Sequence, residues 1–286
     1  MRLSFKTVPQ DSAWEPMRDV WLAADDIDVF SAGWNFDHFY PILQDDRTGP
    51  CFEGWTMLAA LAGVTRRLRL GVMVTGNPYR HPAVLANMAA SLDVISGGRL
   101  ELGIGAGWNV EESTAYGIEL PPLRERFDRL EEACAVLDLL LTRETSSFDG
   151  AYYQLTDARC EPKPVQRPRP PFVIGGAGEK RTLRIAARFA DQWNLPGGTP
   201  EVLAHKIEVL HAHCAEVGRD PASVEVSVQV RARADVQAMA DEAAALAQAG
   251  AQHVIVGFRA PFDASRLEPI AHALVSALDL GARSTK

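Results

Sequence analysis

Residues 67–108 read RLRLGVMVTGNPYRHPAVLANMAASLDVISGGRLELGIGAGW, and this stretch decides the fold. Two apolar runs, residues 68–74 and 100–105, stand on either side of an amphipathic stretch. Neither run alternates apolar with polar residues, which is typical of parallel strands that are covered on both faces. The stretch therefore predicts a strand, a helix and a second strand parallel to the first.

The same alternation of short apolar runs and amphipathic stretches continues along the chain. We expect strands at residues 2–6, 27–31, 68–74, 100–105, 171–175, 191–195, 224–230 and 253–257. This is the number of strands that a closed barrel of alternating strands and helices requires. The predicted fold class is therefore α/β, a (β/α)8 TIM barrel with inserted loops that forms a single domain over residues 1–286.

Apolar spacing predicts three helices most clearly. One covers residues 124–142, where apolar side chains recur every three or four positions. A second has Thr199 as its N-cap and Pro200 as its first residue, and a third covers residues 235–249. Between the first two, Asp149-Gly150 predicts a hairpin turn in an insertion on the barrel.

Composition excludes several classes of function. The 29 basic and 37 acidic residues give a net charge of -8, which opposes binding to nucleic acid. No apolar run reaches the ~18 residues of a membrane span and no signal segment opens the chain, so we expect a soluble cytoplasmic protein. The chain has 4 cysteines without a CxxC pair and no HExxH motif, and we expect no metal site.

The active site of such a barrel lies at the carboxyl ends of the strands, so the residues after each strand are the candidates. After the second strand, Asp37 and His38 stand among aromatic residues. A histidine beside a carboxylate suits general acid–base catalysis, although a histidine held in a loop hydrogen bond would give the same pattern. The stiff turn after the third strand, residues 75–82, suits a flat ligand, although taken alone it is better explained as an ordinary turn. The glycine-rich turn after the fourth strand, residues 103–109, lets the backbone approach a bulky ligand closely.

The turn after the fifth strand, GGAGEKRT at residues 175–182, carries the strongest single motif. Small residues at the start of a helix leave N–H groups unpaired, which makes a phosphate site, and Lys180 or Arg181 would add charge. The alternative is a glycine-rich turn selected for packing. Neither this turn nor residues 103–109 has the spacing of a Walker loop or of a dinucleotide fingerprint.

Taken together, four segments resemble the bacterial luciferase-like superfamily, and more narrowly its deazaflavin (coenzyme F420)-dependent oxidoreductases. The segments are FDHF at residues 36–39, FEGWTMLAALA at 52–62, the stretch 67–108, and PFVIGGAGEKRTLRIAARFADQWN at 171–194. They occur in the family's order over most of the chain.

The resemblance implies a flavin or deazaflavin at the mouth of the barrel. It implies that His38 is a proton donor or polar partner at the reacting ring and that Asp37 contacts the cofactor. It also implies a bulge behind the ring, with a non-proline cis peptide, in the turn formed by Thr75, Gly76 and Asn77. Further cofactor contacts carried over from the family are Ala106, Gly107, Gly176, Ala177, Gly178, Lys180 and Arg181.

One position departs from the family's sugar-phosphate dehydrogenases. Where those enzymes have a catalytic glutamate, this chain has Trp108, which argues against glucose 6-phosphate as the substrate. Trp108 at this position favours an apolar or aromatic face toward the substrate. Trp193, at the end of the predicted sixth strand, is a second candidate substrate contact, although packing in the core explains it equally well. The sequence does not assign the role of the missing catalytic glutamate to Glu111 or Glu112.

The sequence thus predicts an F420-dependent oxidoreductase that transfers a hydride to or from a small organic substrate. The alternative is a monooxygenase that uses reduced FMN and dioxygen. A cofactor-binding barrel without catalysis and a sugar-phosphate isomerase are further alternatives, although no carboxylate base for an isomerase is evident. Implied partners are a flavin or F420 reductase and a second copy of the chain in a homodimer.

Overall fold

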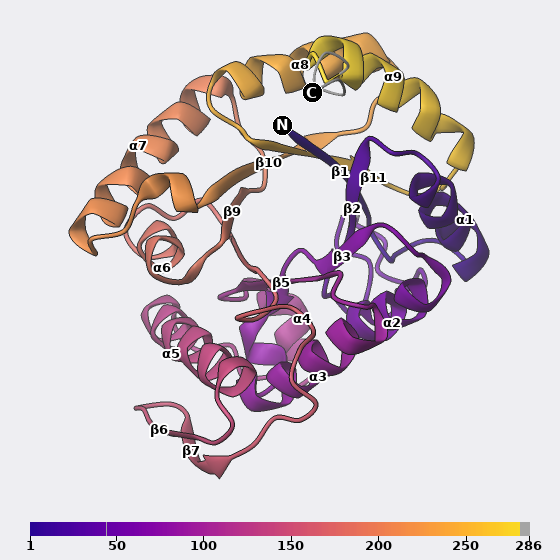
Figure 1. The fold of residues 1–286 in the computed structure, drawn as a ribbon. Coiled ribbons are helices and arrows are strands. Elements are labelled where there is room, and N and C mark those ends of the chain that lie inside the picture. Colours follow the sequence, from indigo (N-terminus) through magenta and orange to yellow (C-terminus); the bar gives the residue numbers. More distant parts are fainter. Residues whose placement is uncertain (44, 281–286) are drawn as a thin grey trace.

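Eight parallel strands form a closed barrel inside a ring of helices (Figure 1). The computed structural model describes residues 1–43 and 45–280. The barrel strands are β1 (Arg2–Thr7), β2 (Phe30–Asn35), β3 (Arg69–Val72), β5 (Leu100–Gly105), β8 (Phe172–Gly175), β9 (Gln192–Leu195), β10 (Glu225–Arg231) and β11 (His253–Phe258). The short strand β4 (Thr75–Gly76) continues along β5. The first and last strands, β1 and β11, pair in parallel and close the ring.

The helices follow the strands and cover their outer faces. They are α1 (Trp14–Asp25), α2 (Gly54–Val64), α3 (Pro82–Ile95), α4 (Val110–Ala115), α5 (Leu123–Thr142), α6 (Thr182–Phe189), α7 (Pro200–Glu216), α8 (Val236–Gln248) and α9 (Leu267–Ala277). The main apolar core lies between strands and helices, with Trp21, Phe30 and Phe172 among its largest buried side chains. Within the described residues, no helix has the length and apolar character needed to cross a membrane.

The predicted barrel is confirmed, and each of the predicted strands overlaps one of its strands. The prediction was wrong by three residues at the second strand, which starts at Phe30 rather than at residue 27. This strand contains Gly33, which looks like a turn residue in the sequence. In the structure Gly33 lies where Trp21 and Phe5 leave no room for a side chain.

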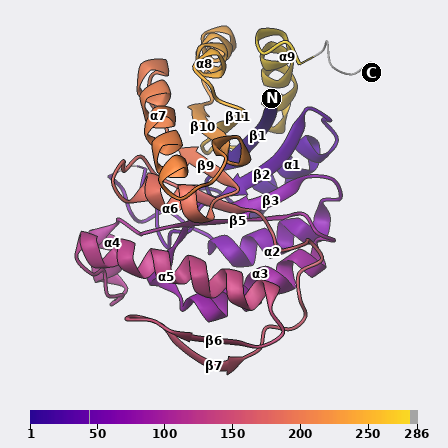
Figure 2. The ribbon, with the colours of Figure 1, turned by 60° about the vertical axis from the view of Figure 1, so that its left-hand side comes forward.

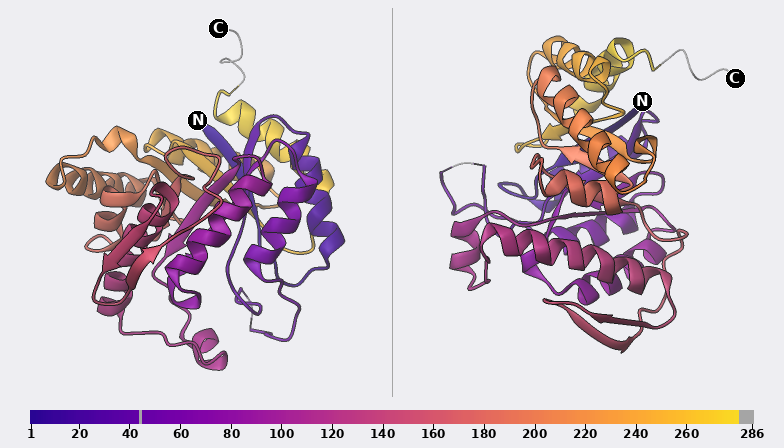
Figure 3. Two further views of the ribbon diagram at one scale, coloured as in Figure 1. Left: turned by 60° about the horizontal axis from the view of Figure 1, so that its bottom comes forward. Right: turned by 90° about the vertical axis from the view of Figure 1, so that its left-hand side faces the viewer.

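The predicted hairpin is also confirmed. Strands β6 (Ser146–Asp149) and β7 (Gln154–Ala158) form an antiparallel ribbon outside α5 (Figures 2 and 3). Its loop is anchored by Glu132 of α5, whose carboxylate accepts hydrogen bonds from three consecutive backbone N–H groups, those of residues 151–153. The insertion therefore packs on the outside of the barrel.

The interior of the barrel is filled in layers from the amino ends of the strands. At the bottom, the buried carboxylate of Glu101 accepts hydrogen bonds from Arg2 and Arg69, each at 2.6 Å. An apolar layer follows, formed by Ala32, Trp34, Met73, Val173 and Ile255. Side chains thus close the lower barrel and leave its carboxyl end open for a site.

Strands β3 and β5 approach each other closely at Gly103 of β5. A Cβ atom at Gly103 would overlap the carbonyl oxygen of Val72 in the adjacent strand. We predict that Gly103→Ala lowers the free energy of unfolding by about 3 kcal/mol or more, because the backbone has to shift. Gly63→Ala is the control: nothing lies within 4 Å of its Cβ position, and alanine should add about 0.5–1 kcal/mol in a helix. Urea unfolding of both variants checks the pair, and equal losses would contradict the packing described.

Candidate active site

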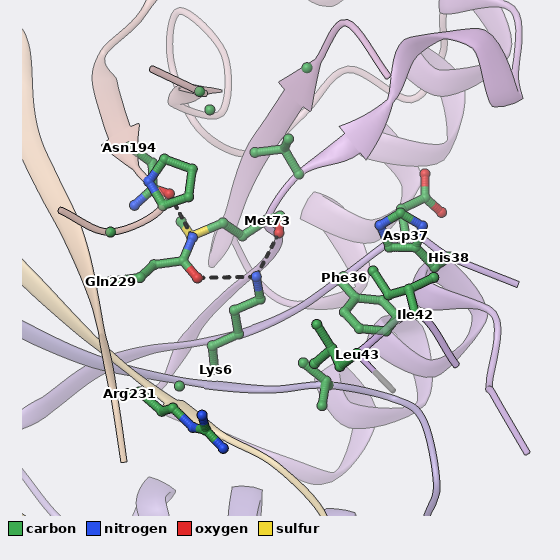
Figure 4. Close-up of a pocket in the computed structure, with 18 of the residues that line it drawn as sticks. Lys6, Phe36, Asp37, His38, Ile42, Leu43, Met73, Asn194, Gln229 and Arg231 are labelled. Atoms are coloured by element: carbon green, nitrogen blue, oxygen red, sulfur yellow. Dashed lines mark hydrogen bonds between the residues drawn. The ribbon is translucent and has the colours of Figure 1, made fainter. Parts of the chain in front are cut away.

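A cavity of about 650 Å³ opens at the carboxyl ends of the barrel strands. This is where barrel enzymes bind their ligands, and the volume is sufficient for a compound of cofactor size. On one side of it lie Phe36, Asp37, His38, Ile42 and Leu43, and on the other lie Asn194 and Gln229 (Figure 4). Of the residues predicted for the site, the cavity is lined by Asp37, His38, Thr75, Gly76, Gly107, Trp108 and Gly176.

His38 is held by a buried carboxylate that sequence reasoning did not assign. Its Nδ1 lies 2.7 Å from Oε2 of Glu112, whose side chain is fully buried. The Tyr79 hydroxyl donates to the same oxygen at 2.6 Å, and the backbone N–H of Phe39 donates to Oε1 at 2.6 Å. Glu112 is thus satisfied on both oxygens and fixes the orientation of the imidazole.

The charge on Glu112 determines which nitrogen of His38 carries a proton. Burial alone would raise the pKa of Glu112, but hydrogen bonds from His38 and Tyr79 outweigh it and hold the pKa below its ordinary value. An ionised carboxylate only accepts hydrogen bonds, so Nδ1 of His38 is the donor. Within the described chain Nε2 has no hydrogen-bond partner, and it can exchange a proton with a ligand in the cavity.

A signal for Glu112 was present in the sequence. Asn109 caps the short helix α4, and its side-chain oxygen accepts a hydrogen bond from the backbone N–H of Glu112 at 3.1 Å. An Asn followed by Glu three positions later is the pattern of a helix start. Reading it would have placed Glu112 in the first turn of a helix directly after the fourth barrel strand.

Aromatic rings enclose His38 on two sides. The ring centroid of Phe36 lies 4.9 Å from that of His38, and the centroid of Trp108 lies 5.7 Å from it, both edge to face. Trp108 is 63% exposed at the mouth of the cavity. It is therefore placed to contact a ligand that reaches His38, and a contact with the substrate itself stays a prediction.

Asp37 lines the cavity, but its carboxylate serves the neighbouring turn. It accepts hydrogen bonds from Arg80 at 2.6 and 3.0 Å and from the backbone N–H of Gly76 at 3.1 Å. Arg80 also contacts Glu53, the N-cap of α2. Asp37 thus fixes the turn after β3, and a direct contact with a cofactor stays a prediction.

The wall formed by this turn differs from the prediction in one detail. The non-proline cis peptide joins Met73 and Val74, and not the residues of the turn 75–77. Thr75 and Gly76 instead continue the sheet as β4 beside β5, so the bulge comes before them. Asn77 faces away from the cavity, where its amide donates to the Tyr153 hydroxyl at 3.2 Å.

The predicted phosphate turn lies at the edge of the cavity. Gly176 lines it with φ of 129°, a conformation that favours glycine. Helix α6 begins just after this turn, and no side chain caps its N-terminus. N–H groups at such a helix start are open to an anion.

Three other residues of the turn do not line the cavity: Ala177, Gly178 and Lys180 are exposed beside it. Arg181 is directed elsewhere, because its guanidinium pairs with Asp128 of α5 at 2.5 Å. The predicted charge contribution of Arg181 is therefore already used within the protein. Ala106 also lies outside the cavity lining and packs against the main core.

Trp193 was predicted to contact the substrate, and the structure contradicts this. Its side chain is fully buried in the core between strands and helices, and its indole N–H donates to the carbonyl of Gly176 at 2.8 Å. Because side chains alternate along a strand, its neighbour Asn194 faces the cavity instead. Trp193 therefore supports the phosphate turn from behind.

Lys6 lies at the floor of the cavity and was not singled out from the sequence. Its Nζ donates to the carbonyl of Met73 at 3.1 Å and to Oε1 of Gln229 at 3.2 Å (Figure 4). Gln229 in turn donates to Asn194 at 2.8 Å. The signal was a lysine within a strand expected to be covered on both faces, because such a position rarely holds a charge without a function.

Over residues 1–43 and 45–280, no cluster of side chains suits a metal ion.

Glu112 makes a testable contribution to stability. Replacing it by Gln removes the charge that three donors share, and we predict a loss of about 3 kcal/mol in the free energy of unfolding at pH 7. Because the pKa of Glu112 is lowered in the fold, this contribution is full above about pH 5 and is lost as the pH falls through the folded-state value. Urea unfolding of wild type and Glu112→Gln should therefore differ at pH 7 and converge toward pH 3.

The matched control is Glu111→Gln. The Glu111 side chain is 63% exposed, and its ion pair with Arg47, at 3.4 Å, lies at the surface. We expect a change below about 0.5 kcal/mol. A pH-independent difference for Glu112→Gln would contradict the role of its charge.

The chain is similar to known proteins in both sequence and fold. A family profile described as "Luciferase-like monooxygenase" matches residues 13–281. An uncharacterized protein of Mycobacterium tuberculosis is 32% identical over 215 residues, which cover 75% of this chain and 72% of the relative. An F420-dependent glucose-6-phosphate dehydrogenase of Microbacterium testaceum is 30% identical over 234 residues, covering 81% and 68%.

Among solved structures, an F420-dependent secondary alcohol dehydrogenase in complex with an F420-acetone adduct has the same fold. It superposes with a TM-score of 0.84 at 18% identity, covering 96% of this chain and 98% of the other. The profile spans nearly the whole barrel, including the strand ends that carry His38 and Gly176. The chain is therefore an oxidoreductase of the luciferase-like monooxygenase family.

Proposed function

We propose that this protein transfers a hydride between coenzyme F420 and a carbonyl or unsaturated organic substrate, with His38 exchanging the proton. The observation that carries the proposal is the pair of His38 and buried Glu112 at the wall of a cavity of cofactor size. The relative from Microbacterium testaceum and the alcohol dehydrogenase structure, both named F420-dependent, support the choice of cofactor.

The residues present fit a flat ring with a phosphate-bearing side chain. Gly105 and Gly175 line the cavity, and a Cβ atom at either position would come within 3 Å of Val74. The Val74 side chain, which also lines the cavity, packs on these two glycines and forms an apolar surface against which a planar ring can lie. We call this surface, formed by Val74, Gly105 and Gly175, the glycine wall. The uncapped start of α6 would hold the phosphate, with Lys180 exposed nearby.

A reduced deazaflavin held here would supply the hydride for the substrate carbon. The protein supplies the proton. Glu112 holds Nδ1 of His38 as a donor, so the imidazolium carries its second proton on Nε2 and can deliver it to a substrate oxygen. Hydride and proton together convert a carbonyl to an alcohol, and the neutral imidazole accepts the proton in the reverse direction. Phe36 and Trp108 pack edge to face against the imidazole ring.

The second candidate is a monooxygenase that uses reduced FMN and dioxygen, which the name of the matching family favours. The glycine wall and the phosphate turn would also accommodate the flat ring and the phosphate of FMN. The monooxygenase reaction, and F420-dependent reduction of a substrate, each consume reduced cofactor and require a reductase to regenerate it.

We predict that the protein oxidises reduced F420 without oxygen when supplied with suitable ketones or enones. His38→Asn should lower this turnover by about 10²-fold or more, the usual contribution of a general acid, while the Kd for F420 stays within a factor of about two. His211→Asn, on the exposed face of α7, is the matched control and should behave like wild type. Absorbance of F420 and an oxygen electrode follow the reaction.

Two outcomes would overturn parts of this proposal. Turnover that requires FMN and consumes oxygen would establish the monooxygenase. Full turnover by His38→Asn would remove His38 as the proton donor.

A further inference from the structure

Lys6, Gly257 and Arg231 form one row across three adjacent strands. Gly257 of β11 is the register partner of Lys6 in β1 and of Arg231 in β10. Register partners point to the same face of a sheet, and all three residues line the cavity. Because Gly257 has no side chain, it leaves a gap between the two cations, where a Cβ atom would have only the Val230 carbonyl within 4 Å, at 3.7 Å.

The charge of Lys6 is not neutralised by the protein. Its two hydrogen-bond partners, the Met73 carbonyl and the Gln229 amide oxygen, are neutral. An ammonium group has three N–H donors, so one remains for a ligand. No carboxylate forms an ion pair with Lys6 among residues 1–43 and 45–280, and its burial lowers the pKa to about 8. A buried charge of this kind is costly unless a ligand compensates it.

Two arginines add to the positive charge. Arg231 and Arg259 line the cavity, and neither has an ion-pair partner in the described part of the chain. Arg231 ends β10 and Arg259 follows β11 at the same end of the barrel, and burial, with the charge of Arg231, lowers the pKa of Arg259. We call Lys6, Arg231, Gly257 and Arg259 the cationic notch.

The carboxylates that line the described cavity do not neutralise this notch. Asp37 is bound by Arg80, and Glu242 by Arg233 at 2.5 Å. The part of the cavity at β1, β10 and β11 therefore carries net positive charge, while the glycine wall belongs to β5 and β8. Apolar side chains of Val8, just after β1, and of Phe258, at the end of β11, also line this part of the cavity.

We propose that the cationic notch binds an oxyanion of the substrate, a carboxylate or a phosphate, so that the substrate is an organic anion with an apolar body. The assignment rests on the proposed function, because it takes the ring and phosphate of the cofactor to occupy the glycine wall and the start of α6. Guanidinium and ammonium groups bind carboxylate and phosphate through charge-assisted hydrogen bonds. The anion would thus be anchored at the notch, and the reacting carbon would face His38 between the notch and the glycine wall.

Lysine resonances provide a test at the site itself. The chain has few lysines, Lys6, Lys163, Lys180, Lys206 and Lys286, so the side-chain signals of protein labelled with ¹³C-lysine resolve individually. We expect sodium acetate and inorganic phosphate, added at constant ionic strength and pH 7, to shift the Lys6 signal saturably. Arg231→Met should raise the apparent Kd by about tenfold or more. Arg66→Met, which removes an exposed charge before β3 at the other end of the barrel, should leave it unchanged.

The same spectra separate this proposal from the proposed function. Absence of a saturable Lys6 shift with both anions would overturn the notch, as would an equal effect of Arg231→Met and Arg66→Met. Displacement of acetate from Lys6 by F420 or FMN would assign the notch to the cofactor and overturn the substrate assignment. If phosphate shifts the Lys6 signal but not the Lys180 signal, the result would count against phosphate binding at the turn 175–182 and would leave the notch proposal intact.

Discussion

The packing of Val74 against glycines of the two neighbouring strands is the constraint on which the site depends. A Cβ atom at Gly105 would lie 2.8 Å from a methyl group of Val74, and one at Gly175 would lie 2.9 Å from the other. Only glycine at these positions lets the bulge at Met73 and Val74 come so close to the barrel wall. The bulge in turn presents the Met73 carbonyl to Lys6 and brings the backbone of Gly76 to Asp37. A substitution at either glycine would therefore disturb the wall, the floor and the turn together.

The barrel interior separates structural charge from charge available to a ligand. At the bottom, Glu101 neutralises Arg2 and Arg69 in a buried cluster. At the top, Glu112 stabilises the proton on Nδ1 of His38, whereas Lys6 has only neutral partners. Fold alone does not choose a reaction for a barrel. In this chain the choice follows from which of the charged groups at the open end remain without a protein partner.

The barrel could be predicted from the sequence because its signals are local. Continuous apolar runs indicate strands covered on both faces, and the Thr199 cap and regular apolar spacing indicate helices, as confirmed at α5, α7 and α8. His38 and Gly176 could be placed at the site because residues after barrel strands meet at one end. The local signal failed at β2, where contact with Trp21 requires glycine in the middle of a strand.

The remaining features depend on contacts between distant residues. The direction of Trp193 follows from the alternation of side chains in β9, and an error of one position moves a residue from the cavity to the core. Glu112 and His38 are 74 positions apart, and their pairing exists only once α4 lies against the loop after β2. The notch likewise requires the register of β1, β11 and β10, which no single segment contains.

The identity of the cofactor that the cavity binds is the central claim to test. We would titrate the purified protein with oxidised F420 and with FMN and follow tryptophan fluorescence, because Trp108 lies beside His38 and Trp193 donates to Gly176. The account predicts saturable quenching by both ligands or by F420 alone, with F420 bound at least about tenfold more tightly than FMN. Tighter binding of FMN, or binding of neither compound, would contradict it.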